Sequence, residues 1–508
     1  MNSKDISTAA TTLAQNPSMH PTRRRFIIGS AAVASGGLAI GLNLMPTKAM
    51  AQTVAAGDTE VNVWVVVKPD DTCVIRIARS EMGQGTRTGL AQLVAEELEC
   101  DWAKVTTESP TPGQSFARKR AWGEMSTGGS RGIRTSEDYV RRGGAVARTM
   151  LLQAAANEFG VPVAELSVSS GVITHTATGR KTSYGKVAAA AAKLTAPDAK
   201  SIQLKNPKDW KIAGKPLKRL DTADKLNGSK VFGVDLRMDG MLCAAIKDCP
   251  VFGGKLAGFD DSKVLKMRGV KAVLQVNPSA VAVVADTWWR AKTALEKLPI
   301  KWDEGPNAQA SSASIAEHLK AGLTAPGDYA GRKEGDPLAA IAGAAIKIEA
   351  TYSTPFLAHA TMEPMNCTAR ITADRAEIWV PTQNGEASHA ALAEASGLPL
   401  GQCEVYKVDL GGGFGRRGGT QDYVHQAVAI AKKFPGTPVK LMWTREEDQA
   451  HDFYRPISQC QMSGGLDANG NLVGLTVRSS GQSINAWLNP QAIKGGKDER
   501  QLQGFWKE

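Results

Sequence analysis

A glycine-rich segment from Asp409 to Gly419 is the clearest sign of chemistry in the sequence. It reads Asp-Leu-Gly-Gly-Gly-Phe-Gly-Arg-Arg-Gly-Gly, with six glycines in its last nine residues. We expect a strand before it and a helix after it, so that backbone amides and the helix N-terminus face an anion. Glycine lets the backbone approach a ligand closely, and Arg416 and Arg417 are suited to hold phosphate oxygens. The alternative is a tight turn needed for packing, but the composition favours anion binding.

Another glycine loop lies within Ser80–Thr88, again between a predicted strand and a predicted helix. It places Gln84 between Gly83 and Gly85. Gln84 offers both donors and an acceptor, so it can hydrogen-bond a heterocycle or a ligand oxygen. Alone, such a loop is more often a turn than a site. Paired with the segment around Gly413, it predicts a large anionic cofactor held from two sides.

Two shorter motifs complete the candidate site: His359-Ala360-Thr361-Met362-Glu363-Pro364 and Thr382-Gln383-Asn384-Gly385. His359 and Glu363 have the i, i+4 spacing of a metal-binding pair. The H-E-x-x-H pattern and a third ligand are both missing, and Pro364 opposes a continuous helix through the pair. We therefore expect no metal held by protein side chains.

The sequence lacks the motifs of several enzyme classes. The sequence has neither the G-x-S-x-G of many hydrolases nor the G-x-x-x-x-G-K-[ST] of P-loop enzymes. Gly413-x-Gly415-x-x-Gly418 does match the dinucleotide fingerprint, although no acidic residue ends the next predicted strand, 439–443. A nicotinamide or flavin enzyme therefore stays open as an alternative.

Alternating strand and helix patterns surround these motifs and predict a mixed α/β fold in three units. Predicted strands cover 61–67, 73–78, 280–285, 377–380, 403–409 and 439–443. Predicted helices begin after residue 86 and cover 139–159 and 288–298, and the stretch 188–200 reads as a helix that runs into a linker. Residues 304–312 read as a linker, and Gly465–Gly470 as a turn between two further strands.

The first 51 residues resemble an export signal. Thr22-Arg23-Arg24-Arg25-Phe26-Ile27 opens an uncharged run to Met45, and Ala49-Met50-Ala51 offers a cleavage site. Paired arginines indicate the twin-arginine route, with cleavage after Ala51 and a periplasmic location. A single membrane anchor is the alternative, but the glycines in the run favour export.

Composition and charge limit the other classes of protein to which the chain could belong. Of 508 residues, 42% are hydrophobic and 22% charged, as in soluble multi-domain proteins. The net charge of +11 lies partly in the amino-terminal segment, and no long Lys/Arg block indicates a nucleic-acid partner. The seven cysteines form no CxxC or zinc-type pattern, so we expect no iron–sulfur, haem or zinc site of the chain's own. One periplasmic disulfide is possible, and Cys243 and Cys249 are the nearest pair in the sequence.

Taken together, these motifs resemble the molybdopterin-binding large subunit of the xanthine dehydrogenase/aldehyde oxidase family, in its isoquinoline 1-oxidoreductase beta-subunit branch. The resemblance implies a multi-domain α/β subunit with a permuted order of domains. The implied parts are a signal peptide (1–51), an amino-terminal molybdopterin-binding segment (52–205), an a/b hammerhead domain (218–304) and an incomplete first molybdopterin-binding domain (340–508).

The resemblance also implies the cofactor and the reaction. The cofactor is molybdenum–molybdopterin, usually in the cytosine dinucleotide form. Cofactor-binding positions carried over by motif are Gly83, Gln84, Gly85, Gln383, Gly412, Gly413, Phe414, Gly415 and Arg416. Family members hydroxylate an aldehyde or an N-heterocycle with oxygen from water. Their electrons leave through a small subunit with two iron–sulfur clusters, and often a cytochrome c.

One departure from the family pattern concerns the catalytic base. Family members continue into a second molybdopterin domain whose G-x-G-E-P segment carries a catalytic glutamate. No such segment occurs up to Glu508, so the sequence offers no catalytic residue of that kind. The expectation is a chain that is truncated, split between two genes or degenerate relative to the family. The alternative function is a non-catalytic remnant that at most binds the pterin or a partner subunit.

Overall fold

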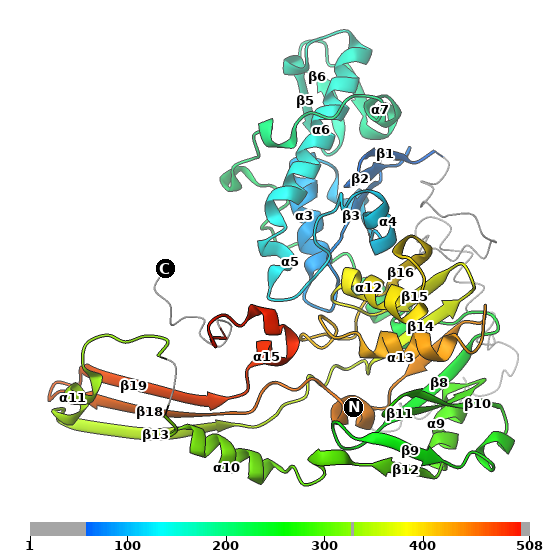
Figure 1. Cartoon of the computed structure of the whole chain (residues 1–508). Coiled ribbons are helices and arrows are strands. Elements are labelled where there is room, and N and C mark those ends of the chain that lie inside the picture. Colours follow the sequence, from blue (N-terminus) through cyan, green and yellow to red (C-terminus); the bar gives the residue numbers. More distant parts are fainter. Residues whose placement is uncertain (1–56, 327–329, 499–508) are drawn as a thin grey trace, which may run out of the picture. The chain divides into compact units, whose positions relative to one another are not determined.

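The glycine loop around Gln84 connects a small β-sheet to a helix, as the sequence predicts. The computed structural model describes residues 57–326 and 330–498, and all of them belong to one compact unit. Strand β3 (Cys73–Arg76) precedes the loop and helix α3 (Thr86–Leu98) follows it (Figure 1). The sheet has the order β1-β2-β3-β4, where β1 is Thr59–Asn62, β2 is Val65–Val67 and β4 is Val105–Glu108.

The predicted single strand over 61–67 is wrong, because the chain folds back on itself there. β1 and β2 pair antiparallel through a turn at Val63 and Trp64. The Asn62 side chain accepts hydrogen bonds from the amides of Trp64 (2.9 Å) and Val65 (3.0 Å). An asparagine side chain that binds the backbone two residues on offers a turn in place of an extended strand.

Helix α3 packs against the long helix α6 (Glu137–Phe159). Their approach depends on Gly143 and Gly144. A Cβ atom on Gly144 would overlap the Val94 carbonyl oxygen of α3, and one on Gly143 would lie 2.5 Å from the Trp64 ring. Helix α3, which begins at the glycine loop, is thereby held closely against α6.

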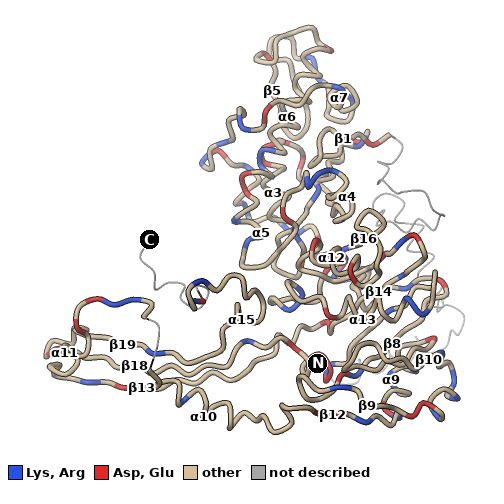
Figure 2. Tube along the Cα trace, in the orientation of Figure 1, with Lys and Arg blue, Asp and Glu red and all other residues tan. Residues whose placement is uncertain are grey.

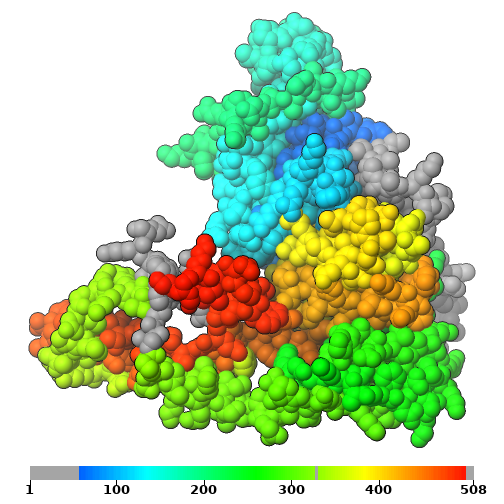
Figure 3. All heavy atoms as spheres, in the orientation of Figure 1, coloured from blue at the N-terminus to red at the C-terminus, as the bar shows by residue number. Residues whose placement is uncertain are grey.

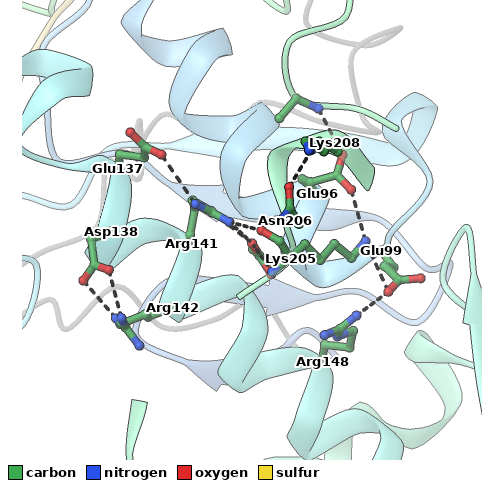
Figure 4. A network of polar contacts seen from close by, with 12 residues as sticks. Glu96, Glu99, Glu137, Asp138, Arg141, Arg142, Arg148, Lys205, Asn206 and Lys208 are labelled. Carbon is green, nitrogen blue, oxygen red and sulfur yellow. Dashed lines mark hydrogen bonds and ion pairs between the residues drawn. The ribbon is translucent and has the colours of Figure 1, made fainter. Parts of the chain in front are cut away.

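A buried polar network also fixes α3 (Figure 4). Glu96 is 1% exposed and accepts hydrogen bonds from the consecutive amides of Lys211, Ile212 and Ala213, at 2.8, 2.6 and 3.1 Å. Glu97 is fully buried and binds Arg141 of α6. Carboxylates that lose their hydration need such partners, so the two glutamates attach the segment after residue 205 to α3 and α6.

A seven-stranded sheet forms the second core. Its order is β10-β11-β8-β17-β14-β15-β16, with β8 Leu242–Asp248, β10 Val270–Asn277, β11 Ala280–Ala285, β14 Asn366–Ile371, β15 Ala376–Val380, β16 Cys403–Lys407 and β17 Val439–Met442. Helices α12 (Gly385–Ser396) and α13 (Asp422–Ala431) pack against it. β8 pairs in parallel with β17, so one sheet crosses from the predicted hammerhead range into the predicted cofactor domain. The predicted boundaries themselves stay a prediction.

A separate three-stranded sheet consists of β13 (Ile346–Thr354), β18 (Ser458–Leu466) and β19 (Leu472–Gly481) (Figure 1). Its last two strands flank the predicted turn at 465–470. Helices α10 (Ser312–Gly322) and α11 (Pro337–Ala342) cover one face. Figure 2 draws much of this sheet in tan, because it carries few charged residues.

The remaining elements are short. They are α4 (Pro112–Ala117), α5 (Arg131–Arg134), β5 (Leu166–Ser169), β6 (Val172–His175), β7 (Lys181–Ser183), α7 (Tyr184–Ala191), α8 (Thr222–Leu226), β9 (Lys255–Phe259), α9 (Trp288–Glu296), β12 (Ile300–Asp303), α14 (Arg445–Ala450) and α15 (Ile484–Leu488). The predicted helix over 188–200 lies earlier than expected, since α7 ends at Ala191. All seven cysteines are free thiols, so no disulfide joins Cys243 and Cys249. Within 57–326 and 330–498, no helix has the length and apolar character to cross a membrane. The predicted signal segment lies outside the described residues.

Candidate functional site

The two glycine loops lie side by side. We call Glu81–Gly85 the first loop and Gly411–Gly415 the second loop. The amide of Leu410 donates to the Glu81 carbonyl oxygen (3.1 Å), and the guanidinium of Arg87 forms an ion pair with Asp409. A Cβ atom added to Gly413 would lie 2.8 Å from Met82 Sδ. Loops far apart in the sequence therefore share one location, as the motif pairing predicts.

Lys407 adds another link between the two loops. It ends strand β16, and its Nζ donates to the carbonyl oxygen of Ala78 at 2.6 Å. Burial, together with the nearby charges of Arg87 and Arg79, lowers the pKa of this lysine to about 7. The segment that leads into the second loop is thus attached to the strand region that leads into the first.

The backbone of the second loop offers three consecutive free donors. The φ angles of Gly412, Phe414 and Gly415 are positive, at 100°, 55° and 116°. Among the described residues, the amides of Gly412, Gly413 and Phe414 donate to no protein group. Consecutive free amides in a loop that mixes positive and negative φ angles can form an anion-binding nest. A left-handed phenylalanine costs about 1 kcal/mol or more, and such strain gathers at binding sites.

Gln383 lies next to this nest. The side chain is 3% exposed, and its Oε1 accepts a hydrogen bond from the Gly415 amide at 2.9 Å. Within the described part of the chain, Nε2 of Gln383 donates to no group. The Gln383 backbone bonds Arg417 and Thr127. The structure therefore places a fixed amide donor beside the nest, and cofactor binding by Gln383 stays a prediction.

The first loop differs from its predicted role, because its own glutamate occupies the start of helix α3. The Glu81 carboxylate accepts from the amides of Gly83 (2.8 Å), Gly85 (3.1 Å) and Arg87 (3.0 Å). The side chain of Gln84 also turns back, with Oε1 bound to the Met82 amide and Nε2 to the Ser80 carbonyl. The expected anion site at this helix N-terminus is therefore filled from within the loop. Cofactor binding by Gly83, Gln84 and Gly85 stays a prediction.

The predicted phosphate clamp of Arg416 and Arg417 is not formed. Arg416 is 2% exposed and donates to both carboxylate oxygens of Asp422, at 2.9 and 2.8 Å. Burial opposes its charge, but Asp422 and Asp452 hold the pKa of Arg416 above its ordinary value. Arg417 is fully buried and donates to the carbonyl oxygens of Pro381 and Glu363. Both guanidinium groups are therefore engaged by protein acceptors.

The second loop also does not open directly into a helix. Helix α13 begins at Asp422, several residues after Gly418. The dinucleotide fingerprint requires its last glycine at the strand-to-helix turn, where the helix starts. The match Gly413-x-Gly415-x-x-Gly418 therefore lacks its structural context, and the anion-binding donors are backbone amides of the loop alone.

A third segment, Ser126–Ser130, lies between the first loop and Gln383 and was missed by the sequence reading. Thr127 Oγ1 accepts from the Ser80 amide (2.9 Å), and the Thr127 amide donates to the Gln383 carbonyl (2.7 Å). Gly129 and Ser130 are exposed with positive φ, and the amides of Gly128 to Ser130 donate to no described residue. The Ser-Thr-Gly-Gly-Ser-Arg run could have identified it. Nearby, the cyan atoms around α4 lie against the yellow atoms of α12 and β16 (Figure 3).

Glu363 supports the second loop through its carboxylate. Its Oε2 accepts from the Gly411 amide (2.9 Å), and its Oε1 accepts from the Val234 amide (3.2 Å). Arg219 supports the first loop in a similar way, through the Gly83 carbonyl (2.8 Å) and Glu81. In the part of the chain that the structure describes, no cluster of three metal-ligating side chains occurs.

Comparison with known proteins agrees with these features. Two models of a molybdopterin cofactor-binding domain match the chain, one over residues 23–235 and the other over residues 323–483. The first match contains the first loop and Ser126–Ser130, and the second contains Gln383 and the second loop. Together they cover most of the chain.

Curated relatives are longer than this chain. It is 28% identical to a membrane-bound aldehyde dehydrogenase [pyrroloquinoline-quinone] of Gluconacetobacter polyoxogenes, over 84% of this chain and 55% of that protein. It is also 28% identical to the isoquinoline 1-oxidoreductase subunit beta of Brevundimonas diminuta, over 86% of this chain and 62% of that protein. The chain thus spans little more than half the length of these two relatives. Among solved structures, quinoline 2-oxidoreductase from Pseudomonas putida 86 matches with a TM-score of 0.42 and 18% identity, over 50% of this chain and 38% of that one.

Proposed function

Because the chain belongs to the molybdopterin-binding large subunits of the xanthine dehydrogenase family, we propose that it holds a molybdenum–molybdopterin cofactor at the second loop and serves an oxidoreductase of the molybdenum hydroxylase type. The observation that carries this proposal is the set of free donors formed by the amides of Gly412, Gly413 and Phe414 and by Nε2 of Gln383. These groups suit an oxygen-rich, negatively charged ligand.

The donors also fit the cofactor's chemistry. When bound, the cofactor supplies a metal centre that accepts two electrons from the substrate. The chain's own contribution is to bind and orient the reacting oxygens. Fixed amides stabilise negative charge on oxygen without having to reorient, which is an effective form of electrostatic catalysis. Phe414 places an apolar ring, 73% exposed in the described structure, beside the same donors.

The substrate class we propose is an aldehyde or an N-heterocycle. The support comes from the names of two relatives, an aldehyde dehydrogenase and an isoquinoline oxidoreductase. We further propose the cytosine dinucleotide form of the cofactor, a small iron–sulfur subunit as electron acceptor with or without a cytochrome c, and a periplasmic location. The dispersed cysteines, six of them buried, support an electron acceptor outside this chain.

Metal and pterin content of the purified 508-residue chain tests the proposal. The chain is produced in a host that synthesises molybdopterin, together with Gly413→Ala and Gly401→Ala. A methyl group on Gly413 would lie 2.6 Å from Gln383 Oε1, whereas one on Gly401 would meet nothing within 4 Å. We expect about one molybdenum per wild-type chain, at least a tenfold loss in Gly413→Ala and no loss in Gly401→Ala. Wild-type chain without molybdenum and pterin would refute the proposal.

A further inference from the structure

His359 lies against the second loop at Gly415. A Cβ atom added to Gly415 would lie 3.4 Å from His359 Nε2 and 3.8 Å from its Cδ2. The edge of the imidazole ring therefore faces the loop one residue after Phe414, whose amide is free. Glu363 of the same motif is already used by the amide of Gly411.

Asp452 fixes the orientation of the imidazole. Both of its carboxylate oxygens lie 3.0 Å from His359 Nδ1, and one of them also accepts the His359 backbone amide. A carboxylate at this distance requires the proton on Nδ1, which is our assignment of the tautomer. Nε2 is then the nitrogen left for other partners, and among the described residues it has none.

Arg416 in turn fixes Asp452. The Asp452 side chain is 2% exposed, and Arg416 Nε lies 3.0 Å from its carboxylate. Trp443 and Phe453 flank the guanidinium, with ring centroids 5.5 and 5.0 Å away. Burial opposes the charge of Asp452, but the hydrogen bonds from His359 hold the pKa of this carboxyl below its usual range. The carboxylate is therefore ionised and rigidly placed.

We propose that His359 Nε2 is a binding contact for the ligand of the second loop, donating in its protonated form to an anionic oxygen of the group that the Gly412–Phe414 amides also hold. Asp452 and Arg416 are positioning residues that act on this group through His359. The inference deepens the proposed function and rests on it where the anionic group belongs to the cofactor. It gives Arg416 a role that its buried position allows, unlike the expected phosphate clamp.

Substitution of His359 tests the contact. The host that makes molybdopterin produces wild type, His359→Ala, His359→Gln and the control His425→Ala, in which the replaced side chain is 41% exposed and lies on α13. Gln keeps an N–H donor. Molybdenum and pterin per chain are measured with the visible absorption spectrum of the bound cofactor. We expect at least a tenfold loss in His359→Ala, retention within about threefold in His359→Gln, and no change in His425→Ala.

A second measurement is needed because a variant that folds poorly would also lose the cofactor. It also separates the His359 contact from the proposed function. The cofactor-free wild-type chain, labelled with ¹⁵N in histidine, is titrated with inorganic phosphate, and the His359 signal is identified by its absence in His359→Gln. We expect phosphate to shift the Nε2 signal of His359 and to leave that of His425 in place. A loaded wild type whose His359→Ala variant keeps full content and an unchanged spectrum would overturn this inference alone. An unloaded wild type would overturn the proposed function, and the phosphate titration would then decide whether His359 binds an anion.

Discussion

Arg87 forms an ion pair with Asp409, although the two residues lie 322 positions apart in the sequence. Arg87 belongs to the first turn of helix α3, directly after the first loop, and Asp409 precedes the second loop. Lys230 also pairs with Asp409, so one carboxylate balances two cations. Asp409 is 9% exposed. Breaking an ion pair with so little solvent around it costs free energy, because a buried charge is left uncompensated.

Replacing Asp409 with Asn tests how much this ion pair contributes to the free energy of unfolding. The substitution keeps the shape of the side chain but leaves Arg87 and Lys230 facing a neutral group. We expect the free energy of unfolding to fall by about 2–3 kcal/mol. The control Asp58→Asn removes a more open pair with Lys68 (3.5 Å) and should cost under about 0.5 kcal/mol. Urea unfolding measures both, and equal losses in the two variants would contradict this account.

The close packing of α3 on α6 predicts a strong effect of Gly144→Ala. In an exposed helix, such a change would be favourable by about 1 kcal/mol. Here the new methyl group would overlap the Val94 carbonyl oxygen, which is backbone and cannot rotate away. We expect a net loss of about 1–3 kcal/mol in thermal or urea unfolding, against no loss in Gly258→Ala, where nothing lies within 4 Å. Equal stability of the two variants would show that the helices can separate freely.

Sequence patterns located the two glycine loops, but they did not predict which partners the charged side chains meet. Glycine-rich composition identified both loops, because the backbone conformations at Gly83 in the first loop and Gly412 in the second are ones that few other residues adopt. No pattern shows which carboxylate an arginine will meet. Arg416 therefore read as a ligand clamp, whereas the fold places it between Asp422 and Asp452.

The pKa of Glu447 predicts how stability changes with pH. Burial raises the pKa of this carboxyl from 4.5 to about 8. Between these values the native state binds more protons than the unfolded state, so the stability contributed by this group is full below about pH 4.5 and is lost as the pH rises to about 8. The loss amounts to at most about 5 kcal/mol. Other carboxyl groups also titrate in acid, so the difference from Glu447→Gln isolates this one. We expect the variant to be the more stable at pH 8. If the free energy of unfolding changed with pH in parallel in wild type and variant, the raised pKa of Glu447 would be contradicted.

One face of the β13–β18–β19 sheet is apolar and open. Ile348, Gly464 and Leu475 are paired across the three strands, so Ile348 and Leu475 share that face, with exposures of 55% and 46%. The double substitution Ile348→Thr with Leu475→Thr places a β-branched, strand-compatible side chain at both positions while reducing exposed apolar area. We expect weaker binding of a hydrophobic dye and less aggregation, with the melting temperature unchanged within about 2 °C. A large loss of melting temperature would mean that this face is covered in solution.

Local reading of the sequence also missed features that only long-range contacts create. The Asn62 turn converts a continuous valine-rich run into a hairpin, and the pairing of β8 with β17 joins two predicted domains into one sheet. Ser126–Ser130 became a candidate only because the fold bonds Thr127 to both Ser80 and Gln383. Such neighbours depend on tertiary packing, which periodicity and composition do not encode.

Hydrogen exchange at the second loop tests the central claim most directly. The amides of Gly412, Gly413 and Phe414 have no protein acceptor in the described chain, so they should exchange rapidly without ligand. Mass spectrometry of peptides that cover 408–418 compares the chain with and without molybdopterin, with β13 as an internal reference. The account predicts strong slowing of exchange in 408–418 on loading and no change in β13. A loaded chain whose 408–418 amides exchange as fast as those of the cofactor-free chain would contradict it.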